Sequence, residues 1–192
     1  CGRSVGQLID RTADPTAHAR FLQYRGVDKF NRSQFNEALG YLDQADKAYA
    51  ENIPADALNA KGAQQASNPF TRGTAARLGG VTPAEGLLTD PIAETALLGL
   101  IEVRRAKASA LRALRRVKEA DDLLVATSEL ARGNGVDRPI VAAPLYRTMG
   151  VTAAALGAHE PAIDRFTRSA LNYQRAMPGS RAQADTNLQY AD

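Results

Sequence analysis

Apolar residues recur along most of this chain at the three- and four-residue spacing that places side chains on one face of an α-helix. The clearest stripe lies between residues 34 and 52 and consists of Phe35, Ala38, Leu39, Leu42, Ala45 and Tyr49. Asp14-Pro15, Ser33 and Asp90-Pro91 are helix-start signals, and Gly133-Asn134-Gly135 is a stop signal. Together these patterns predict helices over about 16–31, 34–52, 54–66, 92–115, 117–132, 139–156 and 160–176. Residues 180–192 are expected to form a terminal helix that covers the end of the stack.

Residues 67–90 interrupt this pattern. Prolines and glycines follow one another closely there, which forbids a long helix and predicts an irregular insertion. Residues 1–14 are expected to be a short polar tether, and residues 15–192 a single helical domain that carries the insertion.

The composition supports a helical protein. The chain has 36 alanines, 11 aromatic residues and no tryptophan, which favours closely packed helices and excludes an all-β fold. Apolar residues make up 44% of the chain, which argues against wholesale disorder. No apolar run approaches the roughly 20 residues that span a bilayer. A net charge of +3 is too small to indicate nucleic-acid binding, and we expect none.

An internal repeat is the strongest signal in the sequence. Small residues precede a later alanine by twelve positions three times, at Gly26 and Ala38, Ala108 and Ala120, and Gly150 and Ala162. The last copy reads Tyr146-x-x-Met149-Gly150-x-x-Ala153, then Gly157 and Ala162-x-x-x-Phe166. It resembles the tetratricopeptide repeat, although the leading tryptophan is missing and the closing proline is missing or displaced. The resemblance covers about residues 16–66 and 92–192. It implies an all-α solenoid of antiparallel helix hairpins, with about seven to nine helices.

The resemblance also implies a binding face. In such stacks the first helix of each hairpin lines a concave groove that binds peptides, and the register of the repeats places eleven residues there. They are Arg20, Gln23, Val27, Phe30, Glu102, Arg105, Ser109, Arg112, Arg147, Val151 and Ala154. We expect Arg20, Gln23, Phe30, Arg105, Ser109, Arg112, Arg147 and Val151 to contact a partner, and the arginines to favour an acidic peptide. Relatives that clamp a C-terminal carboxylate use asparagines where this chain has Val27, Ser109 and Val151, so that clamp is not expected.

The chain offers little chemistry for catalysis. We expect no catalytic residue, no metal site and no cofactor, because His18 and His159 stand alone and neither a phosphate loop nor a nucleophile motif is present. Seven cations lie within fifteen residues: Arg104, Arg105, Lys107, Arg112, Arg115, Arg116 and Lys118. They are interpreted mainly as a solvated helix face that Glu102, Glu119, Asp121 and Asp122 balance, with phosphate or acidic-peptide binding as the alternative.

The first residue is a cysteine, and Cys1-Gly2-Arg3-Ser4 resembles the start of a mature bacterial lipoprotein. That resemblance implies a lipid anchor at Cys1 and a place in the cell envelope, at the outer membrane and facing the periplasm. The leading hypothesis is a non-enzymatic interaction scaffold or assembly factor of an envelope complex, with other proteins as partners. The main alternative is the docking or regulatory region of a larger protein, such as a caspase-like (CHAT-type) peptidase. A soluble adaptor is a third possibility.

Overall fold

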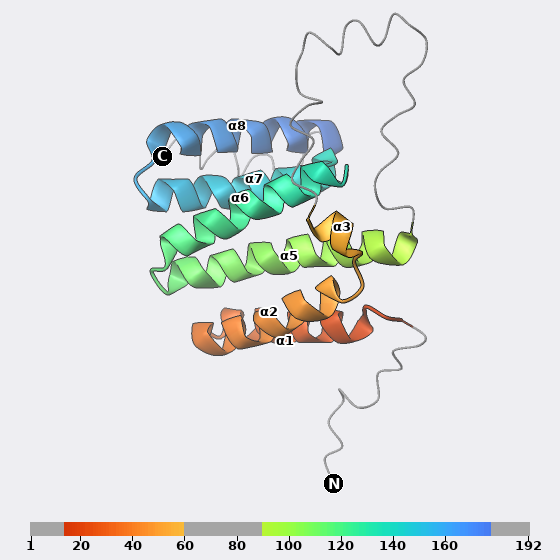
Figure 1. The fold of residues 1–192 in the computed structure, drawn as a ribbon. Helices are drawn as coiled ribbons and strands as arrows, with labels where there is room; N and C mark the ends of the chain where they lie inside the picture. The colour runs from red at the N-terminus through yellow and green to blue at the C-terminus, as the bar shows by residue number, and fades with distance from the viewer. Residues whose placement is uncertain (1–13, 60–89, 178–192) are drawn as a thin grey trace, which may run out of the picture.

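The computed structural model describes residues 14–59 and 90–177, and 82% of these residues are helical, with no β-strand among them. The all-α class predicted from the sequence is therefore confirmed (Figure 1). Seven helices lie in the described ranges. They are α1 (Ala17–Asn31), α2 (Phe35–Ala50), α3 (Ala55–Leu58), α5 (Pro91–Ala113), α6 (Val117–Gly133), α7 (Pro139–Ala155) and α8 (His159–Ala176). The expected terminal helix over 180–192 lies outside these ranges, as do the expected tether over 1–14 and the expected insertion over 67–90 except for their last residues, Asp14 and Asp90.

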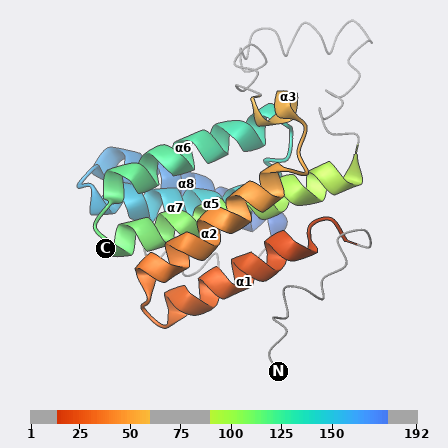
Figure 2. The same ribbon diagram turned by 60° about the horizontal axis from the view of Figure 1, so that its bottom comes forward.

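The long helices pack in the order in which they follow one another along the chain. Contacts join α1 to α2, α2 to α5, α5 to α6, α6 to α7, and α7 to α8. Figures 1 and 2 show the hairpins α1–α2, α5–α6 and α7–α8 following one another across the molecule. The first helices of successive hairpins also touch, α1 against α5 and α5 against α7. The candidate site lies where α5 and α7 face each other.

The three hairpin turns have the same backbone geometry. Ser33, Arg115 and Gly157 adopt positive φ angles of 61°, 65° and 73°. Each of them lies seven residues after the small residue of its repeat. In every turn the amide of this residue donates a hydrogen bond to the carbonyl three residues earlier. The following amide donates to the carbonyl five residues before itself. This pattern is a helix C-cap with a left-handed residue, which glycine adopts without strain. The repeat spacing therefore coincides with these turns, and the turn between α6 and α7 has the same geometry at Gly135, where φ is 67°.

The small residues of the repeat lie where the helices of a hairpin approach closely. A methyl group added at Gly26 would lie 2.7 Å from Cγ of Leu42, and one added at Gly150 would lie 2.7 Å from the Phe166 ring. Leu42 and Phe166 each follow their glycine by sixteen positions, and Leu124 follows Ala108 by the same number. All three large residues are buried. The close partner of each small glycine is thus the large residue one turn beyond the predicted alanine.

Some predicted helix boundaries need correction. Asp14 does not cap α1 directly: its carboxylate accepts hydrogen bonds from the amide and hydroxyl of Thr16, at 2.9 and 2.8 Å, and the helix begins at Ala17. Ser33 does not cap α2, because it occupies the left-handed turn and Gln34 precedes the first helical residue. Asp90 does cap α5 as predicted, since its carboxylate accepts from the amide of Ile92 at 3.0 Å.

The third helix is also shorter than predicted within the described residues. It makes a single turn, Ala55–Leu58, and the rest of the predicted span from residue 60 lies outside the described part of the chain. Asn134 holds this turn against α6: its fully buried side-chain amide donates to the carbonyls of Ala57 and Leu130, both at 2.9 Å.

Candidate functional site

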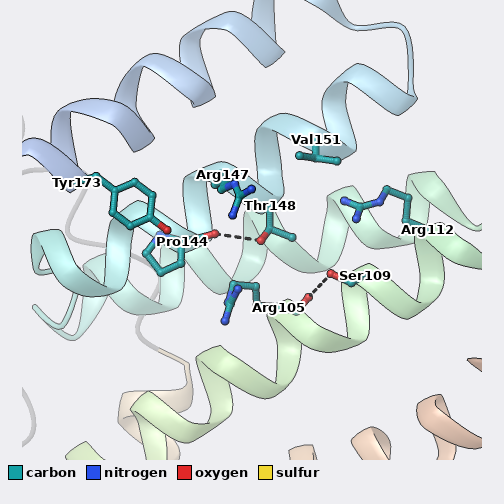
Figure 3. Close-up of a pocket in the computed structure, with 8 residues that line it drawn as sticks. All are labelled: Arg105, Ser109, Arg112, Pro144, Arg147, Thr148, Val151 and Tyr173. Carbon is teal, nitrogen blue, oxygen red and sulfur yellow. Dashed lines mark hydrogen bonds between the residues drawn. The ribbon is translucent and has the colours of Figure 1, made fainter. Parts of the chain in front are cut away.

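A hollow of about 210 Å³ lies between α5 and α7, with one residue of α8 at its edge (Figure 3). Two helix faces form it, because residues four and seven positions apart lie on the same side of a helix. The lining residues are Arg105, Ser109 and Arg112 of α5, Pro144, Arg147, Thr148 and Val151 of α7, and Tyr173 of α8. Three of the eight are arginines and none is acidic, so the hollow is a place where a negatively charged group is attracted.

Arg112 carries the strongest sign of an unmet interaction. Its Nη1 is buried and has no hydrogen-bond partner among the described residues. Burial lowers the pKa of the Arg112 guanidinium because it disfavours the charged form. The group still carries its positive charge, because an arginine side chain is not deprotonated in proteins. A buried donor without a partner costs roughly 1–3 kcal/mol, and a charged one more.

Arg105 lies two turns earlier on the same face of α5. Its terminal Nη2 donates to the carboxylate of Glu102, whereas its Nε is buried without a partner among the described residues. The hydroxyl of Ser109 donates to the backbone carbonyl of Arg105 at 3.2 Å (Figure 3). Glu102 therefore orients this guanidinium without using all of its donors.

The α7 side of the hollow is more apolar. Pro144 and Val151 present hydrocarbon surface, and the hydroxyl of Thr148 donates to the carbonyl of Pro144 at 3.0 Å (Figure 3). Arg147 adds a third positive charge from this helix. The hollow thus combines cationic donors with an apolar wall, a combination that suits a side chain with a charged end and a hydrocarbon stem.

The structure brings together five of the eight residues predicted to contact a partner: Arg105, Ser109, Arg112, Arg147 and Val151. The other three lie on α1 and do not line this hollow. Arg20 pairs with Asp14 at 3.1 Å, and Gln23 accepts a hydrogen bond from the Tyr49 hydroxyl at 2.9 Å. Phe30 packs against Phe35, with ring centroids 5.4 Å apart. Cys1, the predicted lipidation site, lies outside the described residues.

Three lining residues were not predicted. Pro144 and Thr148 lie seven and three residues before the predicted Val151, so helical periodicity from Val151 would have found both. Tyr173 comes from the second helix of its hairpin and is buried. No sequence signal places it at the hollow, because its position depends on how α8 crosses α7.

The cation cluster on α5 and α6 divides into separate roles. Arg104 and Lys107 pair with Asp46 and Asp43 of α2, at 3.3 and 2.5 Å, and so link two neighbouring helices. Nearby pairs join Arg105 to Glu102, Arg116 to Glu119, and Lys118 to Asp122. These pairs fit the interpretation of a balanced helix face for most of the cluster. Asp121 instead pairs with Arg165 of α8 at 2.6 Å. Arg112 is the exception that matters for binding.

A larger hollow of about 380 Å³ lies between α7 and α8, and Tyr146 and Arg168 line it. Arg168 stacks over the ring of Tyr146 at 5.8 Å and pairs with Asp164 at 2.9 Å. Its charge is therefore already compensated. The smaller hollow with the unpaired donors is the better candidate for an anionic ligand.

No model of a known protein family matches this chain, and no curated protein is detectably similar to it. The tetratricopeptide resemblance accordingly stays a prediction. Within residues 14–59 and 90–177, no group of three or more His, Cys, Asp or Glu is gathered as metal ligands. None of the helices in the same ranges is long and apolar enough to cross a bilayer.

Proposed function

We propose that this protein is a non-enzymatic interaction scaffold that binds an acidic segment of a partner protein on the face formed by α5 and α7. The observation that carries the proposal is the hollow with three arginines and no acidic residue among the described residues that line it. The buried donors of Arg105 and Arg112 without partners add to it. A stack of helical hairpins exposes a wide rigid surface, on which charge-assisted hydrogen bonds fix the position of a bound segment.

The repeat supports this proposal from a second direction. The three equivalent hairpin turns and the close contacts at Gly26 and Gly150 are features expected of a repeat protein. Such proteins bind partners along surfaces that several repeats share. The five predicted residues that meet at the hollow come from two successive hairpins, as that mode of binding requires.

The complex in which the scaffold acts is proposed to belong to the bacterial cell envelope, with a lipid anchor at Cys1. This part of the proposal depends on the sequence alone and has its own test. We expect Cys1→Ser to move the protein from the membrane fraction to the soluble fraction, because stable anchoring requires the lipid chains. A variant that stays with membranes after its partners are removed would contradict the anchor.

The binding proposal is tested by purifying the full chain from native membranes in mild detergent. The variant Arg105→Gln/Arg112→Gln removes two charges from the hollow, and the matched control Arg32→Gln/Arg132→Gln removes two exposed charges elsewhere. We expect the first variant to lose a co-purifying protein that the control and the natural sequence retain. Equal recovery of every associated protein in all three preparations would contradict binding at this face.

A further inference from the structure

We propose that the hollow between α5 and α7 binds a single carboxylate, that of an Asp or Glu side chain, with the Arg112 guanidinium as its principal donor. This inference rests on the proposed function, because it names the chemical group by which the partner segment is held. It differs from recognition of a chain terminus, since the ligand is a side chain.

The first argument is the hydrogen-bonding state of the arginines. Nearly all buried polar groups in proteins have partners, so a buried charged donor without one indicates a ligand or a water. The Nη1 of Arg112 is enclosed and has no hydrogen-bond partner among the described residues. Arg105 keeps a second enclosed donor, its Nε, on the same face of α5. Two such donors bordering one hollow indicate that the site is completed by an anion.

The second argument is the shape and chemistry of the walls. Arg112 stands near Val151 across the hollow (Figure 3). A glutamate or aspartate stem has methylene groups that pack on Val151 and Pro144 while its carboxylate meets the guanidinium. The volume of about 210 Å³ is large enough for one such side chain. Arg105 and Arg147 add long-range attraction for the negative charge.

The third argument concerns what Arg112 does for the free protein. The burial of its Nη1 without a partner disfavours the folded state, so a contribution to stability does not account for an arginine at this position. We therefore expect Arg112→Met, which keeps a hydrocarbon side chain at this position, to unfold at the same or a higher temperature. A fall of several degrees would show that Arg112 supports the fold and would overturn this argument.

The direct test uses the full chain with ¹⁵N-labelled arginine and small probes. N-acetylglutamate N-methylamide supplies the carboxylate, and N-acetylglutamine N-methylamide is its neutral counterpart of the same shape. We expect the glutamate probe to shift the Nε–H signals of Arg112 and Arg105 with a saturable dependence on concentration, and the glutamine probe to leave them unchanged. Equal effects of the two probes, or no effect of either, would overturn the inference and would assign the donors to water.

Two further arms complete the test. We expect Arg112→Gln to lower the affinity for the glutamate probe at least about tenfold, which corresponds to one charge-assisted hydrogen bond. Arg132→Gln should change this affinity less than about twofold. Inorganic phosphate is expected to bind more weakly than the glutamate probe, and tighter phosphate binding would replace the carboxylate assignment. If the glutamate probe binds through Arg112 but the co-purifying protein does not depend on it, the proposed function fails while the carboxylate site stands. If the glutamate probe does not bind but Arg105→Gln/Arg112→Gln still loses the co-purifying protein, the carboxylate site fails while the proposed function stands.

Discussion

Replacing Gly150 by alanine is expected to lower the free energy of unfolding, although alanine is the better helix former. The added methyl would lie 2.7 Å from two ring atoms of Phe166, whereas ordinary contact begins at 3.4 Å. Phe166 is buried, so its ring has little room to move away. Overpacking of this kind costs about 1–3 kcal/mol, and the helix-propensity gain returns about 1 kcal/mol. The net loss is therefore about 0–2 kcal/mol.

The helix-propensity contribution is removed by a matched control. Gly40 lies inside α2 and is exposed, and nothing lies within 4 Å of a methyl group added there. We expect Gly40→Ala to raise the free energy of unfolding by about 0.5–1 kcal/mol. The difference between the two variants then isolates the packing penalty of about 1–3 kcal/mol.

Urea unfolding followed by circular dichroism measures both variants, with unchanged m values as the check that the same transition is compared. Gly150→Ala should lower the free energy of unfolding less in a Phe166→Leu background than in the natural sequence, because the clash involves the phenylalanine ring. If Gly150→Ala is as stable as Gly40→Ala, the close approach of α7 and α8 at this glycine is wrong.

Three further predictions test separate features of the fold. At the hairpin turns, Arg115→Gly should stabilise the protein by about 1 kcal/mol and Gly157→Ala should destabilise it by a similar amount, because both positions have positive φ; the same sign for both in urea unfolding would refute the shared turn. Asp121→Ala should lower the free energy of unfolding by about 1–3 kcal/mol, because it leaves the mostly buried Arg165 without its carboxylate. The double variant Asp121→Ala/Arg165→Met should lose less free energy of unfolding than the two single variants added together. Hydrogen bonding from Thr16 lowers the pKa of Asp14, so the contribution of the Asp14 carboxylate to the start of α1 is present above about pH 4. This contribution is lost as the pH falls through the folded-state pKa of Asp14. Protection of the Ala17 amide from hydrogen exchange should therefore fall with the pH in the natural protein and not in Asp14→Asn.

Much of the helical framework was predictable because its signals are local. The stripe from Phe35 to Tyr49, the capping Asp90-Pro91 and the stop after Arg132 each depend on residues within one or two turns. The prediction that Asp14 and Ser33 cap α1 and α2 was wrong. Both residue types also occur in turns, where their side chains or backbones adopt other conformations. The identity of the residue alone does not distinguish a cap from a turn.

The candidate site was predictable to the extent that helical periodicity determines it. Arg105, Ser109 and Arg112 share one face of α5 by spacing alone, and the repeat register pairs this face with α7. The hydrogen bond between Tyr49 and Gln23 and the position of Tyr173 at the hollow both depend on how helices cross. No local sequence pattern specifies these crossings. The contact of Gly99 with the ring of Tyr49, between α5 and α2, was missed for the same reason.

The most direct test of the central claim is photo-crosslinking in native cells from the binding face, followed by mass spectrometry of the adducts. The photoreactive residue replaces Ser109 in the hollow or, as a control, the exposed Ala126 of α6. The account predicts an adduct from position 109 that maps next to an Asp or Glu of one partner segment, that disappears with Arg112→Gln, and that position 126 does not give. Identical adducts from both positions, or an adduct at 109 that persists in Arg112→Gln, would contradict it.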